Sequence, residues 1–495
     1  MDTNRRRTLQ QLVGLTALGA VNLLRTPRAF AADKIARLSI PGVAGKVIRK
    51  QDADYEIWRQ SMVWHLSKPR RFPDMIVQAK SEQDIIGAVN YAAKNRLRIA
   101  VRSGGHNSNG PSLRDGGMLI DVSAMGDIRI DPAQQVASVE TGVRSLELVQ
   151  AAREKGLSFP VPHCPSVGIG GFTLGGGIGW NWAQRGGVAT HSIVGADIIT
   201  ADGKKRRATA NENPDLYWAV RGAGPGFFGV ITRLDLQLYP APKSIMASSY
   251  IFALSDLETV TTTLDAIRKA HDTSRVEVLA VLMHHPEAPF DAPPEKSKIC
   301  FFTAFAFEDS EDKSRKALAP FAQSDLATKC LVKIEHQPFD FEGLYERYFS
   351  LNDPGGRCGR YAVDNVLTNQ GGKALHALAG HFYSAPAKDC HVLGAFNMGT
   401  KIHPDSCFSW AIDCYVGCYA IWDEEKDDER NFAWLHKAIP LIDPFAEGHY
   451  INEVEGRGRP DRYRECFTAA NWKRLQDLRQ KYDPAGVFHS YLGHS

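Results

Sequence analysis

The chain has 495 residues, of which 43% are hydrophobic and 23% are charged, and its formal net charge is +3. These values exclude a disordered chain and predict a globular protein of two or three domains. A charge this close to neutral gives no reason to expect binding to nucleic acid or to an anionic membrane.

The first 31 residues differ in character from the rest of the chain. Three consecutive arginines at 5–7 precede the apolar run LVGLTALGAVNLL, and an Ala-Phe-Ala triplet ends at Ala31. This pattern predicts a signal peptide over 1–31 that is cleaved near Ala31, because the apolar run is shorter than the roughly 20 residues of a membrane span. A retained N-terminal anchor helix is the alternative interpretation.

The arginines are similar to those of a twin-arginine signal, although Gln10 stands where that signal prefers an apolar residue. We therefore expect a bacterial protein that the twin-arginine export machinery carries in folded form, that is periplasmic or secreted, and that keeps no stable membrane span.

Nine cysteines are an odd number for an exported protein. We interpret Cys164 as the unpaired one, for reasons given below. The other eight either form disulfides or remain buried thiols, and their spacing assigns no pairs. Cys414 and Cys418 stand in the apolar run WAIDCYVGCYAIW, which favours core cysteines over a metal site. No metal site is predicted.

From about residue 73 to 240, short β-branched runs alternate with helical stretches. Residues 75–80 predict a strand, 81–95 a helix with Ser81 as its N-cap, and 97–105 a strand that ends in a glycine turn. A further strand at 118–125, a helix at 145–156 and a hairpin over 192–210, turning at Asp202-Gly203, complete an α/β block.

The elements after about residue 243 are longer. Strands are predicted at 248–254, 276–285 and 297–307, with a helix at 256–271 between them. This pattern favours a sheet covered by helices, which could form a roof over a cofactor. The terminal segment contains YINEVEG at 450–456 and a helix at 471–482 that stops at Asp483-Pro484.

Two glycine-rich segments contain the residues that point to chemistry. VRSGGHN at 101–107 follows an apolar strand, and its adjacent glycines allow backbone N–H groups to surround an anionic pyrophosphate. PHCPSVGIGGFTLGGGIGW at 162–180 is so rich in glycine that a ligand or another backbone is expected close by. The dinucleotide fingerprint and the phosphate-binding P-loop are both excluded, because neither G-x-G-x-x-G opening a helix nor Gly-Lys-Ser/Thr is present.

These two segments, the run NPDLYWAVRGAGPGFFGVITRLDLQLYP at 213–240 and the terminal YIN, N..RL and YDPAGVF motifs resemble the berberine bridge enzyme-like branch of the vanillyl-alcohol oxidase flavoproteins. The resemblance spans nearly all of the chain after the leader. It implies an α+β fold: a two-lobed FAD-binding domain of the VAO/PCMH type at 32–242, a substrate domain with a helix-covered antiparallel sheet at 243–440, and a segment at 441–495 that completes the FAD site.

The resemblance also implies that FAD is bound covalently twice, through His106 to its 8α-methyl group and through Cys164 to carbon 6. Residues 102–108 are expected to hold the pyrophosphate, and the backbone of Gly229 and Val230 is expected on the adenine side. The FAD-contacting residues implied are Arg102, Ser103, Gly104, Gly105, His106, Asn107, Ser108, Cys164, Val167, Gly168, Gly170, Gly171, Gly175, Gly229, Val230, Asn452 and Asn471. Each asparagine has a strand-end or helix-cap role as its alternative, and Ala469 replaces the glycine usual before Asn471.

Removing a hydride from a carbon that carries a hydroxyl requires a base for the hydroxyl proton. Where many relatives have a tyrosine after the YxN motif, this chain has Glu453, and Tyr450 is a second candidate. Strand alternation predicts Tyr450 and Asn452 on one face and Glu453 on the other, so the choice stays open. His163 is a third possibility, with a packing role as its alternative.

The family's residue three positions after the cysteine controls access of oxygen to the flavin, and valine there is typical of oxidases. This chain has Val167. The resemblance therefore implies an FAD-dependent oxidase that transfers hydride from a small organic substrate (an alcohol, a sugar or a secondary metabolite) to flavin N5 and releases hydrogen peroxide after reaction with O2. The alternatives are a dehydrogenase with another acceptor and an inactive flavin- or carbohydrate-binding protein. The sequence identifies no substrate.

Overall fold

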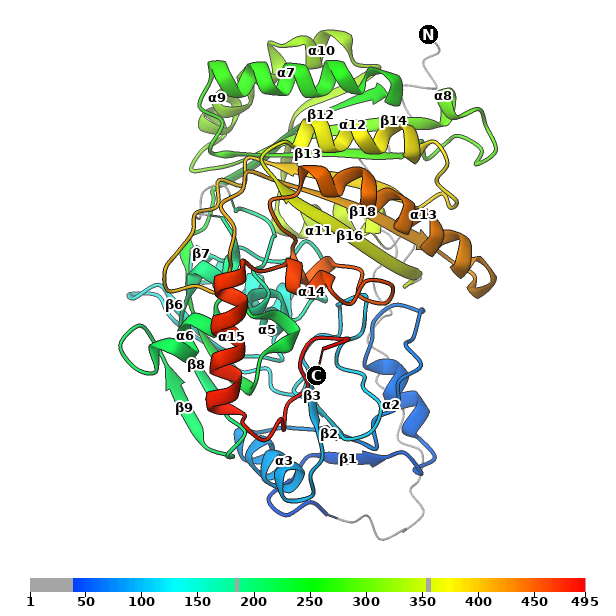
Figure 1. The fold of residues 1–495 in the computed structure, drawn as a ribbon. Coiled ribbons are helices and arrows are strands. Elements are labelled where there is room, and N and C mark those ends of the chain that lie inside the picture. The colour runs from blue at the N-terminus through cyan, green and yellow to red at the C-terminus, as the bar shows by residue number, and fades with distance from the viewer. Residues whose placement is uncertain (1–38, 183–186, 353–357, 495) are drawn as a thin grey trace.

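The computed structural model describes residues 39–182, 187–352 and 358–494, so the predicted signal peptide at 1–31 lies outside the described residues. Three sheets of four or more strands, together with a two-stranded sheet, form two lobes, with the largest sheet and its helices above the four- and five-stranded sheets in Figure 1. The α+β fold predicted from the sequence is confirmed.

A four-stranded sheet of order β1-β2-β4-β3 opens the chain. Its strands are β1 (Lys46–Arg49), β2 (Met75–Gln78), β3 (Ile99–Arg102) and β4 (Met118–Asp121), and β4 pairs in parallel with both β2 and β3. Helix α3 (Glu82–Lys94) connects β2 to β3, and Ser81 caps it by accepting a hydrogen bond from Asp84 N at 3.2 Å. The strand-helix-strand prediction for 75–105 is confirmed.

An antiparallel five-stranded sheet follows, of order β5-β6-β10-β8-β9. The strands are β5 (Ile128–Asp131), β6 (Val136–Glu140), β8 (Ile193–Ile199), β9 (Lys205–Ala208) and β10 (Val230–Gln237). Gly203 N donates to Thr200 O in the turn between β8 and β9, which confirms the predicted hairpin. The second glycine-rich segment contains only a short helix, α5 (Ile169–Leu174), on the way from β6 to β8.

The third sheet is antiparallel and has seven strands in the order β15-β12-β14-β13-β17-β18-β16. They are β12 (Ser244–Ala253), β13 (Val276–His284), β14 (Lys298–Glu308), β15 (Val332–Phe339), β16 (Arg360–Thr368), β17 (His391–Phe396) and β18 (Cys414–Trp422). Helices α7 (Leu257–Ala270), α9 (Glu311–Ala322), α10 (Asp325–Lys329), α12 (Gly371–Phe382) and α13 (Asp428–Ile442) cover its outer face (Figure 1).

Side-chain alternation gives this sheet two different faces. On β18, the even-numbered residues Cys414 to Trp422 pack in the core beneath the helices, whereas Tyr415, Tyr419 and Ile421 belong to the core shared with the lower lobe. The inner face of the sheet therefore forms a roof over the lower lobe, as the sequence predicted.

The C-terminal segment joins the two lobes. Gly448 O accepts from Leu367 N of β16, and further on Val487 O accepts from Ile99 N of β3 at 2.7 Å. Between these points lies α15 (Ala469–Tyr482), which ends before Asp483 as predicted.

The remaining helices and strands are α2 (Tyr55–Ser61), α4 (Ser145–Arg153), β7 (Leu157–Ser158), α6 (Pro214–Val220), β11 (Tyr239–Pro240), α8 (Pro294–Ser297), α11 (Phe341–Asn352) and α14 (Arg462–Glu465).

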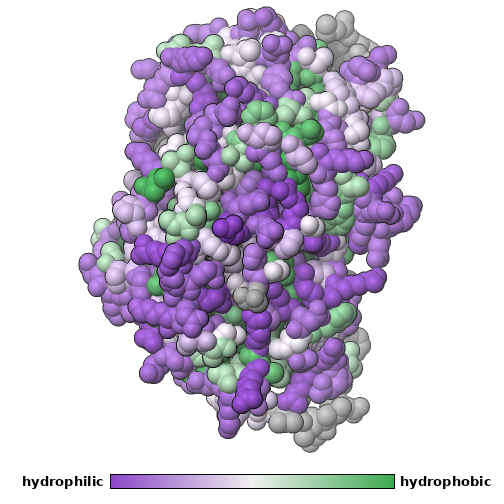
Figure 2. Space-filling view, viewed as in Figure 1, coloured by the Kyte–Doolittle hydropathy of each residue, from purple (hydrophilic) through white to green (hydrophobic). Residues whose placement is uncertain are grey.

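The surface seen in Figure 2 is mainly hydrophilic, with hydrophobic residues scattered among polar ones. Among the described residues, no helix combines the length and the apolar character that crossing a bilayer requires. All nine cysteines lie in the described part of the chain, and none of the disulfides considered from the sequence is present there.

Candidate active site

One cavity lies where both glycine-rich loops, the C-terminal segment and the inner face of the large sheet meet. The predicted site residues that line it are Arg102, Ser103, Gly104, Gly105, His106, Asn107, Ser108, Cys164, Val167, Gly168, Gly170, Gly171, Gly229, Tyr450, Asn452 and Glu453. The fold therefore brings together residues that are up to 351 positions apart in the chain.

The first loop begins where β3 ends. Arg102 attaches it to the sheet, because Nη1 pairs with Asp121 Oδ1 at 3.0 Å and Nη2 donates to Gly104 O at 3.1 Å. Gly105 has a φ of +72°, which only glycine adopts without strain, and a Cβ there would overlap Met62 O. The turn that presents His106 thus depends on its glycine.

The second loop contacts the first directly, backbone to backbone. A Cβ on Gly168 would lie 2.6 Å from Gly104 N, and a Cβ on Gly104 would overlap Gly168 N. The absence of both side chains lets the loops meet, and this contact places the turn that contains His106 beside the turn that contains Cys164.

The imidazole of His106 is held on two sides. The Trp64 ring stacks on it with centroids 5.0 Å apart and planes at 13°, and Ser166 Oγ lies 3.0 Å from Nε2. Burial, aided by the positive charges of Arg102 and Arg144, lowers the pKa of His106 to about 3. The ring is therefore neutral at physiological pH.

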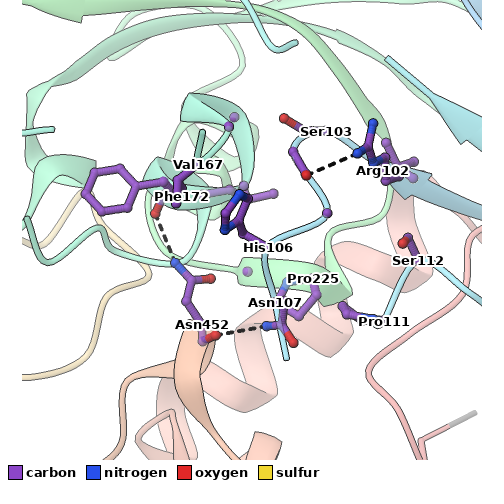
Figure 3. Close-up of a pocket in the computed structure, with 18 of the residues that line it drawn as sticks. Arg102, Ser103, His106, Asn107, Pro111, Ser112, Val167, Phe172, Pro225 and Asn452 are labelled. Carbon is purple, nitrogen blue, oxygen red and sulfur yellow. Dashed lines mark hydrogen bonds between the residues drawn. The ribbon is translucent and has the colours of Figure 1, made fainter. Parts of the chain in front are cut away.

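The C-terminal segment does not follow the predicted strand alternation. Residues Ile451–Glu453 form a turn of 3₁₀ helix, so Tyr450, Asn452 and Glu453 all line the cavity and the predicted placement of Tyr450 and Glu453 on opposite faces of a strand is wrong. Asn452 Nδ2 donates to Phe172 O at 3.1 Å, and Asn107 Nδ2 donates to Asn452 O at 3.0 Å (Figure 3). These bonds join the segment to both glycine-rich regions.

Two tyrosines of β18 hold the Glu453 carboxylate. Tyr415 OH donates to Oε2 at 2.6 Å and Tyr419 OH donates to the same oxygen at 3.0 Å. Among the described residues, Oε1 has no hydrogen-bond partner, so it is the oxygen available to a ligand in the cavity. Burial raises the pKa of Glu453, and the two phenol hydrogen bonds oppose that rise.

The buried Asn365 of β16 fixes the backbone that carries these groups. Its Nδ2 donates to Tyr450 O at 3.1 Å and to Glu453 O at 3.0 Å, while its Oδ1 accepts from Tyr450 N at 2.8 Å. One amide side chain thus satisfies three backbone groups of a segment that has no strand partner of its own.

Three residues predicted to contact FAD do not line the cavity. Asn471 Nδ2 donates to Cys407 O and Ser409 Oγ, which is a structural role. Val230 is buried in the core beside the four-stranded sheet, and a Cβ on Gly175 would overlap the Asn452 amide, so Gly175 makes room for Asn452. His163 lines the cavity and packs edge-on against Trp180, with ring centroids 4.6 Å apart.

The sequence did not single out several residues that complete the site. Tyr415 and Tyr419 lie four positions apart on one face of β18, a spacing that would have paired them once the strand was recognised. Trp64 and Asn365 gave no such signal, because each acts through contacts with residues far away in the chain. Over the described ranges, no group of three or more His, Cys, Asp or Glu side chains could hold a metal ion.

Comparison with known proteins identifies the class of enzyme. Residues 73–209 match the family model described as an FAD binding domain. The FAD-linked oxidoreductase nodO of Hypoxylon pulicicidum is 29% identical over 437 residues, which cover 87% of this chain and 93% of that protein. The (R)-6-hydroxynicotine oxidase of Paenarthrobacter nicotinovorans is 37% identical over 244 residues, 48% of this chain and 52% of that one. Residues 73–209 therefore match an FAD binding domain, and the relatives that match most of the chain's length are FAD-linked oxidoreductases.

Solved structures of other proteins have the same fold as this chain. The 6-hydroxy-D-nicotine oxidase of Arthrobacter nicotinovorans matches with a TM-score of 0.77 and 22% identity, covering 92% of this chain and 98% of that one. The Physcomitrella patens BBE-like 1 protein also matches with a TM-score of 0.77, at 17% identity over 91% of this chain and 98% of that one. The fold that the resemblance to the berberine bridge enzyme-like flavoproteins implied is confirmed.

The cavity of the oxidoreductase fits FAD on its own geometry. A Cβ on Gly171 would meet no protein atom within 4 Å, so a cofactor can approach the backbone there. Two buried nitrogens that face the cavity, Arg102 Nε and His489 Nε2, have no hydrogen-bond partner among the described residues. Burial and the charges of Arg114, Arg98 and Arg479 lower the pKa of His489 to about 3. Such a cationic end with unused donors suits a diphosphate.

We expect Gly104→Ala to lower the free energy of unfolding by about 1–3 kcal/mol, because the added methyl group would push the two glycine loops apart. Thermal unfolding of the purified protein measures the change. Gly126→Ala is the control, since a Cβ there meets nothing within 4 Å. Equal stability of the two variants would contradict the importance of the loop contact.

Proposed function

We propose that the protein is an FAD-dependent oxidase that binds FAD covalently through His106 and Cys164, uses Glu453 as the catalytic base, and passes electrons to O2 to form hydrogen peroxide. The observation that carries this proposal is the position of the Glu453 carboxylate, held by two tyrosines, in the same cavity as His106 and Cys164. The substrate class is an alcohol, a sugar or a secondary metabolite that bears a hydroxyl group.

When bound, FAD would supply the hydride acceptor, and the chain's own residues would accept the hydroxyl proton of the substrate. Glu453 would accept the hydroxyl proton of the substrate through Oε1, since Tyr415 and Tyr419 already occupy Oε2. The two phenols stabilise the charged form of the carboxylate and so oppose the rise that burial causes in the pKa of Glu453. Tyr450 is less suited to act as the base, because burial raises its pKa and its hydroxyl accepts from Ile178 N.

Aromatic side chains shape the end of the cavity nearest Glu453. Trp64 and Tyr361 meet edge-on with centroids 5.5 Å apart, and Tyr361 meets Tyr419 at 6.0 Å. Flat aromatic faces stack well on a sugar ring or on an aromatic substrate. Two of the proteins with this fold are named as oxidases of 6-hydroxy-D-nicotine and of a xylooligosaccharide, which supports the choice of an oxidase.

We also propose that the enzyme is exported in folded form by the twin-arginine machinery and acts in the periplasm or outside the cell. The predicted leader at 1–31 supports this proposal. The described residues contain no disulfide, which suits a protein that folds before export.

The covalent attachment predicts a specific peptide pattern. In the wild type, mass spectrometry should find flavin on both the His106 and the Cys164 peptides, and acid precipitation should leave the yellow colour in the pellet. His106→Ala and Cys164→Ala should each retain one link, whereas the double variant should release its FAD on denaturation. Unmodified masses for both wild-type peptides would contradict the attachment.

The assignment of Glu453 predicts the pH dependence of kcat/KM. The raised pKa of Glu453 places the acid limb above the pH at which an ordinary glutamate titrates, and activity is lost as the pH falls through that limb. Tyr415→Phe removes a hydrogen bond to the charged form, so the pKa rises further and the limb moves to higher pH. Glu453→Gln should lower kcat by roughly 100- to 10,000-fold.

A pH profile for Tyr415→Phe that coincides with that of the wild type would exclude Glu453 as the group that titrates. Tyr217→Phe serves as a control, because the Tyr217 hydroxyl donates to Ile193 O at 2.8 Å and the residue does not line the cavity.

The oxidase assignment predicts fast reaction of the reduced enzyme with air. Val167 lines the cavity, and Val167→Ile adds a methylene group that narrows the space available to O2. Stopped-flow reoxidation should be complete within seconds in the wild type, with hydrogen peroxide as product, and slower in Val167→Ile. A wild-type half-life of many minutes would favour a dehydrogenase instead.

A further inference from the structure

The surroundings of the His106 ring determine both its position and which of its two nitrogens is directed at Ser166. A neutral imidazole carries one proton, and the nitrogen without it has the lone pair that can form a bond. Ser166 Oγ is hydrogen-bonded to Nε2 at 3.0 Å, and Trp64 covers one face of the ring while its Nε1 donates to His106 O at 3.0 Å. The stack and the hydrogen bond together fix which nitrogen is directed at Ser166.

Ser166 itself is held in place by the turn that contains it. Val167 N donates to Cys164 O, and the residues on either side of Ser166 are bonded to the start of α4: Leu146 N donates to Pro165 O at 3.1 Å and Ser145 N donates to Val167 O at 2.9 Å. The hydroxyl therefore has a fixed position relative to the ring, and the Gly104–Gly168 contact keeps the two loops in register.

We propose that Ser166 is a positioning residue for the covalent attachment of FAD: its hydroxyl accepts the Nε2 proton of His106 in a hydrogen bond and thereby leaves the lone pair on Nδ1, the nitrogen that bonds to the flavin. This inference rests on the proposed attachment through His106. A hydroxyl suits the task both before and after the reaction, because it can accept from Nε2–H at first and donate to the Nε2 lone pair once Nδ1 is substituted.

The atoms and electrons of the attachment reaction balance when O2 is the oxidant. A bond forms between Nδ1 and the 8α carbon, and one C–H bond of that carbon breaks. Its electron pair remains in the flavin ring, which is thereby reduced by two electrons and takes up the methyl proton and the imidazole N–H proton. O2 then removes the two electrons and both protons as hydrogen peroxide, so the ring returns to its oxidised form.

The test compares substitutions at position 166 that differ in the hydroxyl group. Ser166→Thr keeps the hydroxyl, Ser166→Val has nearly the shape of threonine without it, and Ser166→Ala removes it with the least change in volume. The full-length proteins are produced in riboflavin-limited cells, purified and incubated with FAD in air. Mass spectrometry then follows the fraction of the His106 peptide that carries flavin, with the Cys164 peptide of the same sample as the internal control.

We expect attachment at His106 to be slowed about tenfold in Ser166→Ala and Ser166→Val, the factor that one ordinary hydrogen bond contributes, and to be retained in Ser166→Thr. Attachment at Cys164 should continue in all three variants and shows that the site is folded. Equal rates at His106 in the valine and threonine variants would overturn the role of Ser166 while leaving the covalent attachment intact. A wild-type His106 peptide without flavin would overturn the attachment itself, and the role of Ser166 with it.

Discussion

The backbone contact between Gly104 and Gly168 is the constraint on which the geometry of the site depends. One loop leaves the four-stranded sheet and the other lies between β6 and β8 of the five-stranded sheet, so no strand pairing joins the two loops. Any side chain at either glycine would separate the loops. Because they touch, His106 lies beside the turn that contains Cys164 and Ser166. The imidazole of His106 and the thiol of Cys164 therefore share one wall of the cavity.

The two ends of the cavity carry opposite charges: arginines line one end, and the carboxyl group of Glu453 lies at the other. Arg102, Arg114 and His489 line the end nearest the four-stranded sheet, where unused N–H donors suit a diphosphate. Glu453 lies beneath the large sheet, and its carboxylate is stabilised by neutral phenols rather than by a cation. A cation paired with Glu453 would lower the pKa of its carboxyl group, whereas the two phenols only oppose the rise that burial causes, which suits the proposed role of Glu453 as a base.

The sequence predicted the local elements and the two loops because both leave short-range signals. The Ser81 cap, the alternation in β12 to β14 and the glycine density of 162–180 can each be recognised in a short window. The orientation of Glu453 could not be predicted in this way, since the turn of 3₁₀ helix at Ile451–Glu453 is imposed by Asn365 across the fold. Asn471 shows the same limit: its motif was recognised, but its amide is used by Cys407 and Ser409.

The segment that carries Tyr450 and Glu453 belongs to neither lobe, and asparagine amides from both lobes hold it. Asn365 of β16 binds its backbone from above, while Asn107 donates to Asn452 O and Asn109 donates to Val454 O from the first glycine loop below. An amide side chain offers a donor and an acceptor, so it can replace the strand partner that this segment lacks. Glu453 is thereby fixed relative to the two glycine-rich loops by direct bonds, and not by the packing of the outer helices. Those helices form a separate core on the far side of the large sheet. Their residues can therefore change without altering the distance between Glu453 and His106.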